Sequence, residues 1–152
     1  DVGNVHAYFL GEHGDSEFPA WSMTHIAGVH IDDFCPICRK CNDWQNERER
    51  IVKTVKESAY HIINYKGATY FAIGMALVRI VGAIFQDQRS VLPVSTLLQG
   101  EYGLQDVCLG VPCVVGQGGV KQIVEAPLRK DEKEALSRSA SILRDVLHKI
   151  NG

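Results

Sequence analysis

Three apolar runs separated by short, glycine-containing turns constrain the fold of this chain most strongly. Residues 91–98, 107–115 and 120–126 are rich in β-branched and aliphatic side chains, and the segments between them are 99–103 and 116–119. Strand-like runs joined by turns this short pair as antiparallel neighbours. The sequence therefore predicts an antiparallel meander, and Pro93 predicts that its first strand lies at an edge or carries a bulge.

The second turn, Gly116-Gln117-Gly118-Gly119, also invites interpretation as a nucleotide-binding loop. A dinucleotide fingerprint needs a strand before it, a helix after it and an acidic residue further along a βαβ unit. The residues on both sides here are strand-like, which favours a glycine hairpin. No other stretch offers such a fingerprint or a phosphate-binding loop, so the 152 residues contain no recognisable dinucleotide-binding half.

Two long segments before the meander and one after it have helical character. The pattern from Asn46 onwards predicts a helix with one apolar face, which comprises Ile51, Val52, Val55, Ala59, Ile62 and Ile63. Gly67 predicts a stop or kink of this helix. A last helix from about Asp131 has an apolar face of Leu136, Ala140, Leu143, Leu147 and Ile150. Together these patterns predict an α+β fold of antiparallel strands with long helices packed on them.

Residues 68–85 are nearly all apolar and approach the length of a membrane span. Arg79 lies within the segment and its flanks are strongly polar, so a helix buried between a sheet and another subunit fits better. The apolar helical faces exceed what one small sheet covers, which predicts a homo-oligomer.

Charge and cysteine content exclude several classes of function. A formal net charge of −2 gives no basic surface for nucleic acid and no polybasic membrane anchor, and no signal peptide is visible. Five cysteines argue against a closed disulfide framework and for a reducing cytoplasm. Cys35, Cys38 and Cys41 suggest zinc, but a structural site needs four ligands and no second close pair follows, so we expect thiols without a metal.

The segment Leu10-Gly11-Glu12-His13-Gly14-Asp15-Ser16-Glu17 carries the strongest functional signal. It follows the apolar run 5–10, which predicts a strand, and its two glycines predict a tight loop around His13. A histidine beside an aspartate is most often a surface residue, yet a histidine at a strand end among carboxylates suits proton transfer near neutral pH. Asp15, two residues away, would project to the other side of an extended loop, so it is not assigned as the partner of His13.

Residues 10–16 closely resemble the active-site signature of the L-lactate dehydrogenase family, within the lactate/malate dehydrogenase superfamily and of the bacterial type. Lys66-Gly67-Ala68-Thr69-Tyr70, Val94-Ser95-Thr96 and residues 110–115 resemble the same family in the same order. The resemblance implies that residues 1–152 are the carboxyl-terminal, substrate-binding and catalytic domain, truncated at its amino-terminal end. The Rossmann half, the mobile loop, the substrate-clamping arginine and the histidine-orienting aspartate would lie upstream, so the isolated chain should have little or no activity.

The resemblance also implies roles for individual residues. It makes His13 the acid/base that protonates the substrate carbonyl as hydride arrives from NADH, with NAD as the cofactor. Thr69 would border the substrate and Ile73 would pack against the nicotinamide ring, although a pair four residues apart on one helix face is by itself an ordinary core pattern. His6 matches a position where allosteric bacterial members bind fructose 1,6-bisphosphate between subunits, while taken alone it is a packed or surface histidine.

Three functions remain open on the sequence. The first is interconversion of pyruvate and L-lactate with NADH and NAD, in a cytoplasmic enzyme that resemblance makes a homotetramer. The second is the oxaloacetate/malate reaction of the same superfamily; Glu12 and residues 16–19 resemble the lactate branch more closely. The third is a non-catalytic assembly domain, because these residues could fold and associate without turnover.

Overall fold

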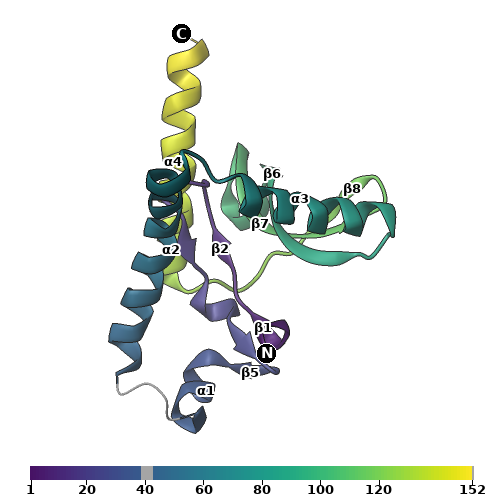
Figure 1. The fold of residues 1–152 in the computed structure, drawn as a ribbon. Coiled ribbons are helices and arrows are strands. Elements are labelled where there is room, and N and C mark those ends of the chain that lie inside the picture. Colours follow the sequence, from purple (N-terminus) through teal and green to yellow (C-terminus); the bar gives the residue numbers. More distant parts are fainter. Residues whose placement is uncertain (39–42, 152) are drawn as a thin grey trace.

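The computed structural model describes residues 1–38 and 43–151, and its largest sheet is the predicted antiparallel meander (Figure 1). Its strands, in spatial order, are β6 (Ser90–Gln99), β7 (Gln105–Gly116) and β8 (Gly119–Ile123). β6 lies at the edge, as Pro93 predicted, and Pro93 faces Pro112 across the ladder. The register of this pair shifts between Leu98 and Gln99, at the far end of the strand from Pro93.

The glycine-rich segment is the turn between β7 and β8, where Gly116 pairs with Gly119. Gly118 and Gly119 have φ values of 85° and 100°, a left-handed conformation that glycine adopts without steric cost. The hairpin prediction is confirmed, and the nucleotide-loop interpretation is excluded for these residues.

Short elements fill the first thirty residues. The prediction of a single strand over residues 5–10 is wrong. The run divides into two two-residue strands, β1 (Val5–His6) and β2 (Phe9–Leu10), because each part has a different partner. β1 pairs with β4 (His25–Ile26), whereas β2 pairs with β3 (Phe18–Pro19). Between them, Tyr8 uses its carbonyl oxygen to accept a hydrogen bond of 2.9 Å from Ala20 N. The elements are η1 (Val2–Asn4), β1 (Val5–His6), β2 (Phe9–Leu10), β3 (Phe18–Pro19), η2 (Trp21–Met23), β4 (His25–Ile26) and β5 (Val29–His30).

The described residues also form four α-helices, which are α1 (Ile31–Cys38), α2 (Trp44–Lys66), α3 (Tyr70–Phe85) and α4 (Lys130–Asn151). The carboxylate of Asp43 caps the start of α2 by accepting hydrogen bonds from the backbone of Gln45 and Asn46. Gly67, with φ of 80°, ends α2 as predicted. None of the helices in the described ranges has the length and apolarity needed to cross a membrane.

The core lies between the meander, the first residues of the chain and two helices. Alternate residues of β7 are buried from Val107 to Val115, as expected for a strand with one face turned inward. α3 runs across the sheet, and α4 extends beyond the other elements towards the carboxyl end (Figure 1). The fully buried side chains around this sheet include Leu10, Leu98, Leu109, Leu136 and Ala140.

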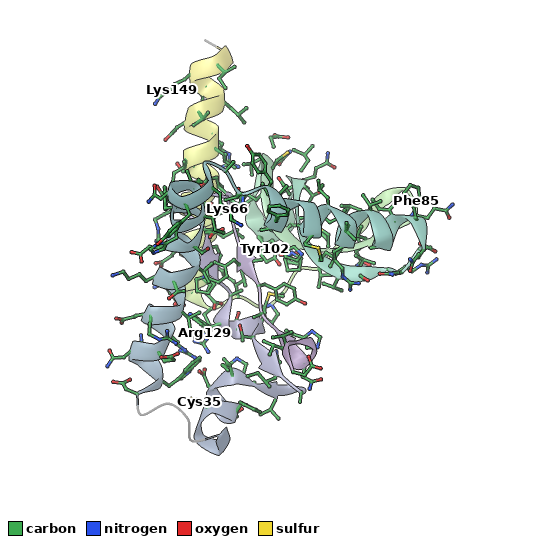
Figure 2. All side chains as sticks on the ribbon, in the orientation of Figure 1. Cys35, Lys66, Phe85, Tyr102, Arg129 and Lys149 are labelled. Atoms are coloured by element: carbon green, nitrogen blue, oxygen red, sulfur yellow. The ribbon has the colours of Figure 1, made fainter. Side chains whose placement is uncertain are left out.

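A second contact region joins α1, α2 and the segment before α4. Asp32 accepts hydrogen bonds from the guanidinium groups of Arg48 and Arg129 and from Trp44 Nε1, and the last of these is 3.0 Å long. The guanidinium carbon of Arg48 lies 5.3 Å from the ring centre of Trp21 and 4.9 Å from that of Trp44. Arg129 is labelled in Figure 2 at this junction.

α3 is less buried within this chain than its composition suggests. Ala83 is its buried residue, whereas Phe71, Met75, Val78 and Phe85 are 66–85% exposed. These four residues follow helical spacing and form one line along the helix, which we call the outer stripe. Figure 2 shows Phe85 at the end of α3 that points away from α4.

Candidate active site

His13 lies on the loop between β2 and β3, as the two glycines predicted. Its Nδ1 atom is 3.5 Å from Oε2 of Glu17, and its side chain is 99% exposed while that of Glu17 is 17% exposed. The carboxylate next to this imidazole is thus that of Glu17, four residues later in the sequence. The loop presents a histidine to solvent with a fixed acidic neighbour.

The sheet holds the start of this loop. Gly11 N donates to Gly110 O and Gly110 N donates to Gly11 O, each over 2.9 Å. β8 pairs with β7 between Cys113 and Gly116, so Gly110 lies on a stretch of that edge that β8 leaves uncovered. A Cβ atom on Gly110 would meet Gly11 O at 2.9 Å, which is why glycine fits this close approach.

The last helix, α4, holds the same loop from another side. Glu12 N donates to Oγ of Ser139 over 2.6 Å, and the Ser139 hydroxyl lies 3.0 Å from that of Ser16. Ser16 in turn donates to Oε2 of Glu12 over 2.6 Å. The side chain of Ser139 is fully buried, next to the buried apolar residues Leu136 and Ala140 of the same helix.

α2 makes the third contact with the loop, through Asp15. Tyr60 donates its hydroxyl proton to Oδ1 of Asp15 over 3.1 Å, and Lys56 Nζ donates to the Asp15 carbonyl oxygen over 2.7 Å. The hydrogen bond to this carboxylate raises the pKa of Tyr60, because it stabilises the protonated phenol. Asp15 therefore helps to hold the loop, and the carboxylate beside His13 belongs to Glu17.

These three contacts place His13 at the edge of a cavity of about 660 Å³. The loop contributes His13 and Glu17, the sheet contributes Ser95 and Cys108, and Ile80 of α3 and Leu143 of α4 form apolar walls. A cavity with apolar walls and a few polar groups on one side suits a small polar molecule. An exposed acid/base and a concave surface thus meet at this loop.

The structure puts Thr69 and Ile73 elsewhere. Thr69 is the residue before the first turn of α3 and lines a second cavity, of about 330 Å³, together with His61 and Tyr65 of α2. Ile73 lies in the first turn of α3 and is 53% exposed. Within the described part of the chain, neither residue is among those lining the cavity of His13.

His6 is exposed on β1 and pairs in register with His25 of β4. The rings of His25 and His30 meet edge to face with centres 5.2 Å apart, so three histidines follow one another across this small sheet. In residues 1–38 and 43–151, no group of three or more His, Cys, Asp or Glu side chains is arranged to hold a metal ion. The cysteine triplet that suggested zinc falls largely outside the described residues, which omit 39–42 and the side chains of 36–38.

Cys108 and Cys113 of β7 occupy opposite environments. Cys108 is exposed and lines the cavity of His13, whereas Cys113 is fully buried and its thiol donates to Val111 O over 3.3 Å. Burial raises the pKa of the Cys113 thiol to about 11, so this thiol stays protonated near neutral pH.

The residues around His13 that sequence reasoning missed are Glu17, Tyr60, Gly110 and Ser139. Ser139 had a recognisable signal, since it is a polar residue between Leu136 and Ala140 on the apolar face of a helix. Gly110 also had one, because a glycine within a strand marks a bulge or a close backbone approach. Neither signal indicates which distant segment makes the contact.

Comparison with known proteins places the whole chain in one group. The profile of the lactate/malate dehydrogenase alpha/beta C-terminal domain matches residues 1–151. The L-lactate dehydrogenase of Treponema denticola is 50% identical and the match covers 99% of this chain and 48% of that protein. L-lactate dehydrogenase 1 of Clostridium acetobutylicum is 48% identical, again over 99% of this chain and 48% of the relative.

Solved structures give the same result for the fold. The minor L-lactate dehydrogenase from Enterococcus mundtii, in a ligands-bound form, superposes with a TM-score of 0.91 at 41% identity, covering 99% of this chain and 47% of that one. A lactate dehydrogenase from a Medee basin deep-sea metagenome library superposes with a TM-score of 0.92 at 42% identity, covering 100% of this chain and 48% of that one. The chain thus spans about half the length of the relatives it matches.

Proposed function

The chain belongs to the lactate/malate dehydrogenase family as its alpha/beta carboxyl-terminal domain, and from this premise we propose that it is the substrate-binding part of an NAD-dependent L-lactate dehydrogenase. The proposed reaction interconverts pyruvate and L-lactate. The observation that supports it most directly is the loop of His13, an exposed imidazole beside Glu17 at the edge of a cavity of about 660 Å³.

His13 is the proposed proton donor and acceptor. When hydride adds to the carbonyl carbon of pyruvate, negative charge develops on the carbonyl oxygen. A protonated imidazole donates a hydrogen bond to that oxygen and then transfers its proton, which gives the hydroxyl group of lactate and a neutral ring. In the reverse direction the neutral ring accepts the hydroxyl proton, and the Glu17 carboxylate lies 3.5 Å from Nδ1 of the charged ring that results.

The proposed cofactor, NAD, supplies or accepts the hydride when it is bound. Among the described residues the glycine-rich segment is a hairpin between antiparallel strands, so these residues offer no cradle for a pyrophosphate. We therefore propose that the dinucleotide binds mainly to protein outside the 152 residues and meets this domain at Ile73, whose exposed side chain gives an apolar surface. Thr69, at the start of the same helix, is the proposed neighbour of the substrate.

His6 is proposed to take part in binding fructose 1,6-bisphosphate between subunits, together with an arginine outside this chain. Its exposure on β1 supports this, because a phosphate-binding histidine must be reachable. If His6→Ala left activation by fructose 1,6-bisphosphate unchanged in the longest natural form of the protein, this role would be withdrawn.

The active protein is proposed to be a cytoplasmic homo-oligomer, a tetramer by analogy with the family. The outer stripe of α3 supports association, since exposed apolar side chains in a continuous line mark contact surfaces. For the isolated 152 residues we propose little or no turnover, because His13 is 99% exposed and a proton donor open to bulk water lacks the excluded environment that the reaction needs.

The deciding experiment follows NADH oxidation by the longest natural form of the protein, with pyruvate and oxaloacetate in parallel. A strong preference for pyruvate that His13→Gln abolishes, while NADH binding persists, supports the proposal. Preference for oxaloacetate moves the protein to the malate branch. If the protein oxidises NADH with neither acid, His13 is an ordinary surface histidine and the proposal fails. If the protein does not bind NADH at all, the result favours the assembly domain.

A further inference from the structure

Ser139 of α4 is joined to the His13 loop by a closed ring of hydrogen bonds. Glu12 N donates to Ser139, and Ser16 donates to the carboxylate of Glu12. A serine hydroxyl has one proton, so Ser16, having given its proton to Glu12, must accept from Ser139 across their 3.0 Å separation. All three donors therefore point the same way round the ring, which begins at the backbone of Glu12 and ends at the side chain of the same residue.

This arrangement fixes the residue immediately before His13 at both its backbone and its side chain. The ring ends on a charged carboxylate, and hydrogen bonds to a charged acceptor are stronger than neutral ones. It is buried at Ser139, where bulk water does not compete for the hydroxyl. A serine inside a helix commonly bonds to the carbonyl of its own preceding turn, whereas this one donates to and accepts from the loop of His13.

Two further contacts leave this ring little freedom. A Cβ atom on Gly11 would lie 2.8 Å from Ser139 Oγ, so the hydroxyl is packed directly against the loop backbone. Leu143, one helical turn after Ser139, forms a wall of the cavity at which His13 lies. The same face of α4 thus holds the loop and shapes the cavity.

We propose that Ser139 is a positioning residue for His13: it acts through Glu12 and Ser16 to hold the imidazole in place at the cavity. The role of His13 in this statement rests on the proposed function, whereas the hydrogen-bonded ring does not. Loss of the Ser139 hydroxyl would free Glu12 and allow the acid/base to move, and small displacements of a reacting group cost large factors in rate.

The test compares Ser139→Ala with Ser137→Ala and Ser141→Ala in the longest natural form of the protein. The two control serines are exposed on the same helix. We expect Ser139→Ala to lower kcat for pyruvate by about tenfold while the Kd of NADH stays unchanged, and we expect the controls to match the wild type. A kcat within about twofold of the wild type would overturn the proposal.

A second comparison separates positioning from general structural support. If Ser16 and Ser139 act through one ring, Ser16→Ala should lower kcat in the same direction, and the double variant should lose little more than Ser139→Ala alone. Fully additive losses would overturn the proposal. If Ser139→Ala does not fold, Ser16→Ala alone tests the proposal, and an unchanged kcat of Ser16→Ala would overturn it.

Amide hydrogen exchange at Glu12 keeps this inference distinct from the proposed function. Exchange should be faster in Ser139→Ala and in Ser16→Ala than in Ser137→Ala, because the ring protects the Glu12 amide. A wild-type protein that reduces neither acid would refute the proposed function, and this measurement would still decide whether Ser139 holds the loop. Equal exchange in all variants would refute the ring itself.

Discussion

Gly11 of the His13 loop and Gly110 of β7 exchange both of their backbone hydrogen bonds, although they lie far apart in the sequence. The contact depends on the absence of a side chain at Gly110, where a Cβ atom would meet Gly11 O at 2.9 Å. Since the obstructing atom belongs to the backbone, it cannot move aside as the end of a flexible side chain could.

Gly110→Ala should therefore destabilise the domain and displace the start of the loop. We expect a loss of about 1–3 kcal/mol in the free energy of unfolding, measured by urea denaturation, as for other overpacked sites. Gly82→Ala in α3 is the control, because a Cβ atom there has no neighbour within 4 Å and alanine favours a helix. Equal stability of the two variants would contradict the prediction.

The contact between Tyr60 and Asp15 predicts a pH dependence. The pKa of Tyr60 is raised by its hydrogen bond to Asp15, so the contact is fully present below the pKa of an unfolded tyrosine and is lost as the pH rises through that of Tyr60. Asp15→Asn should lower the Tyr60 pKa towards that of an exposed tyrosine. Ultraviolet titration of this variant measures the change, and the difference between the wild type and Tyr60→Phe identifies the signal of Tyr60. Asp33→Asn is the control. If Asp15→Asn leaves the Tyr60 titration unaltered, the contact does not form in solution.

The two cysteines of β7 should differ sharply in reactivity. The exposed thiol of Cys108 is open to solvent and should react with a thiol reagent. Cys113 is fully buried and its pKa is raised to about 11, so it should react only on unfolding. Mass spectrometry after brief labelling identifies the modified residue, and Cys108→Ser serves as control. Comparable labelling of Cys113 in the native protein would contradict its burial.

The outer stripe of α3 should control association. Val78 is 66% exposed at its centre, and Val78→Glu would place a charge where an apolar contact is proposed. We expect the association constant to fall by about tenfold or more, measured as molar mass by light scattering across a concentration series. Val120→Glu is the control: it changes a valine of β8 that is 41% exposed and lies outside α3, so it should keep the wild-type mass. A Val78→Glu protein of unchanged mass would exclude the stripe from the interface.

Local patterns in the sequence were sufficient for the larger elements. The three apolar runs of the meander and the stop or kink at Gly67 are local properties, and the sheet and the helix end predicted from them are confirmed. The strand expected over residues 5–10 failed because β-propensity does not distinguish one partner strand from two. Propensity describes a segment, whereas pairing depends on what lies beside it.

The surroundings of His13 were harder to predict for the same reason. The loop and its histidine follow from a short motif, but the residues that hold it come from α2, β7 and α4. Ser139 is one serine among several on its helix, and only the folded chain shows that it faces Glu12. Thr69 and Ile73 were paired by helical spacing, yet Thr69 lies just before the first turn of α3, where that spacing does not yet apply.

The attachment of the His13 loop to Gly110 and Ser139 also orders events during protein synthesis. The ribosome makes the loop long before it makes β7 and α4, so the nascent loop at first lacks its contacts with Gly110 and Ser139. Bringing such distant segments together costs chain entropy, and the contacts that offset this cost can form only after the later segments have been synthesised. A polypeptide released before Ser139 is translated would carry the histidine but not the geometry around it, and interrupted synthesis would yield chains with an incompletely formed site.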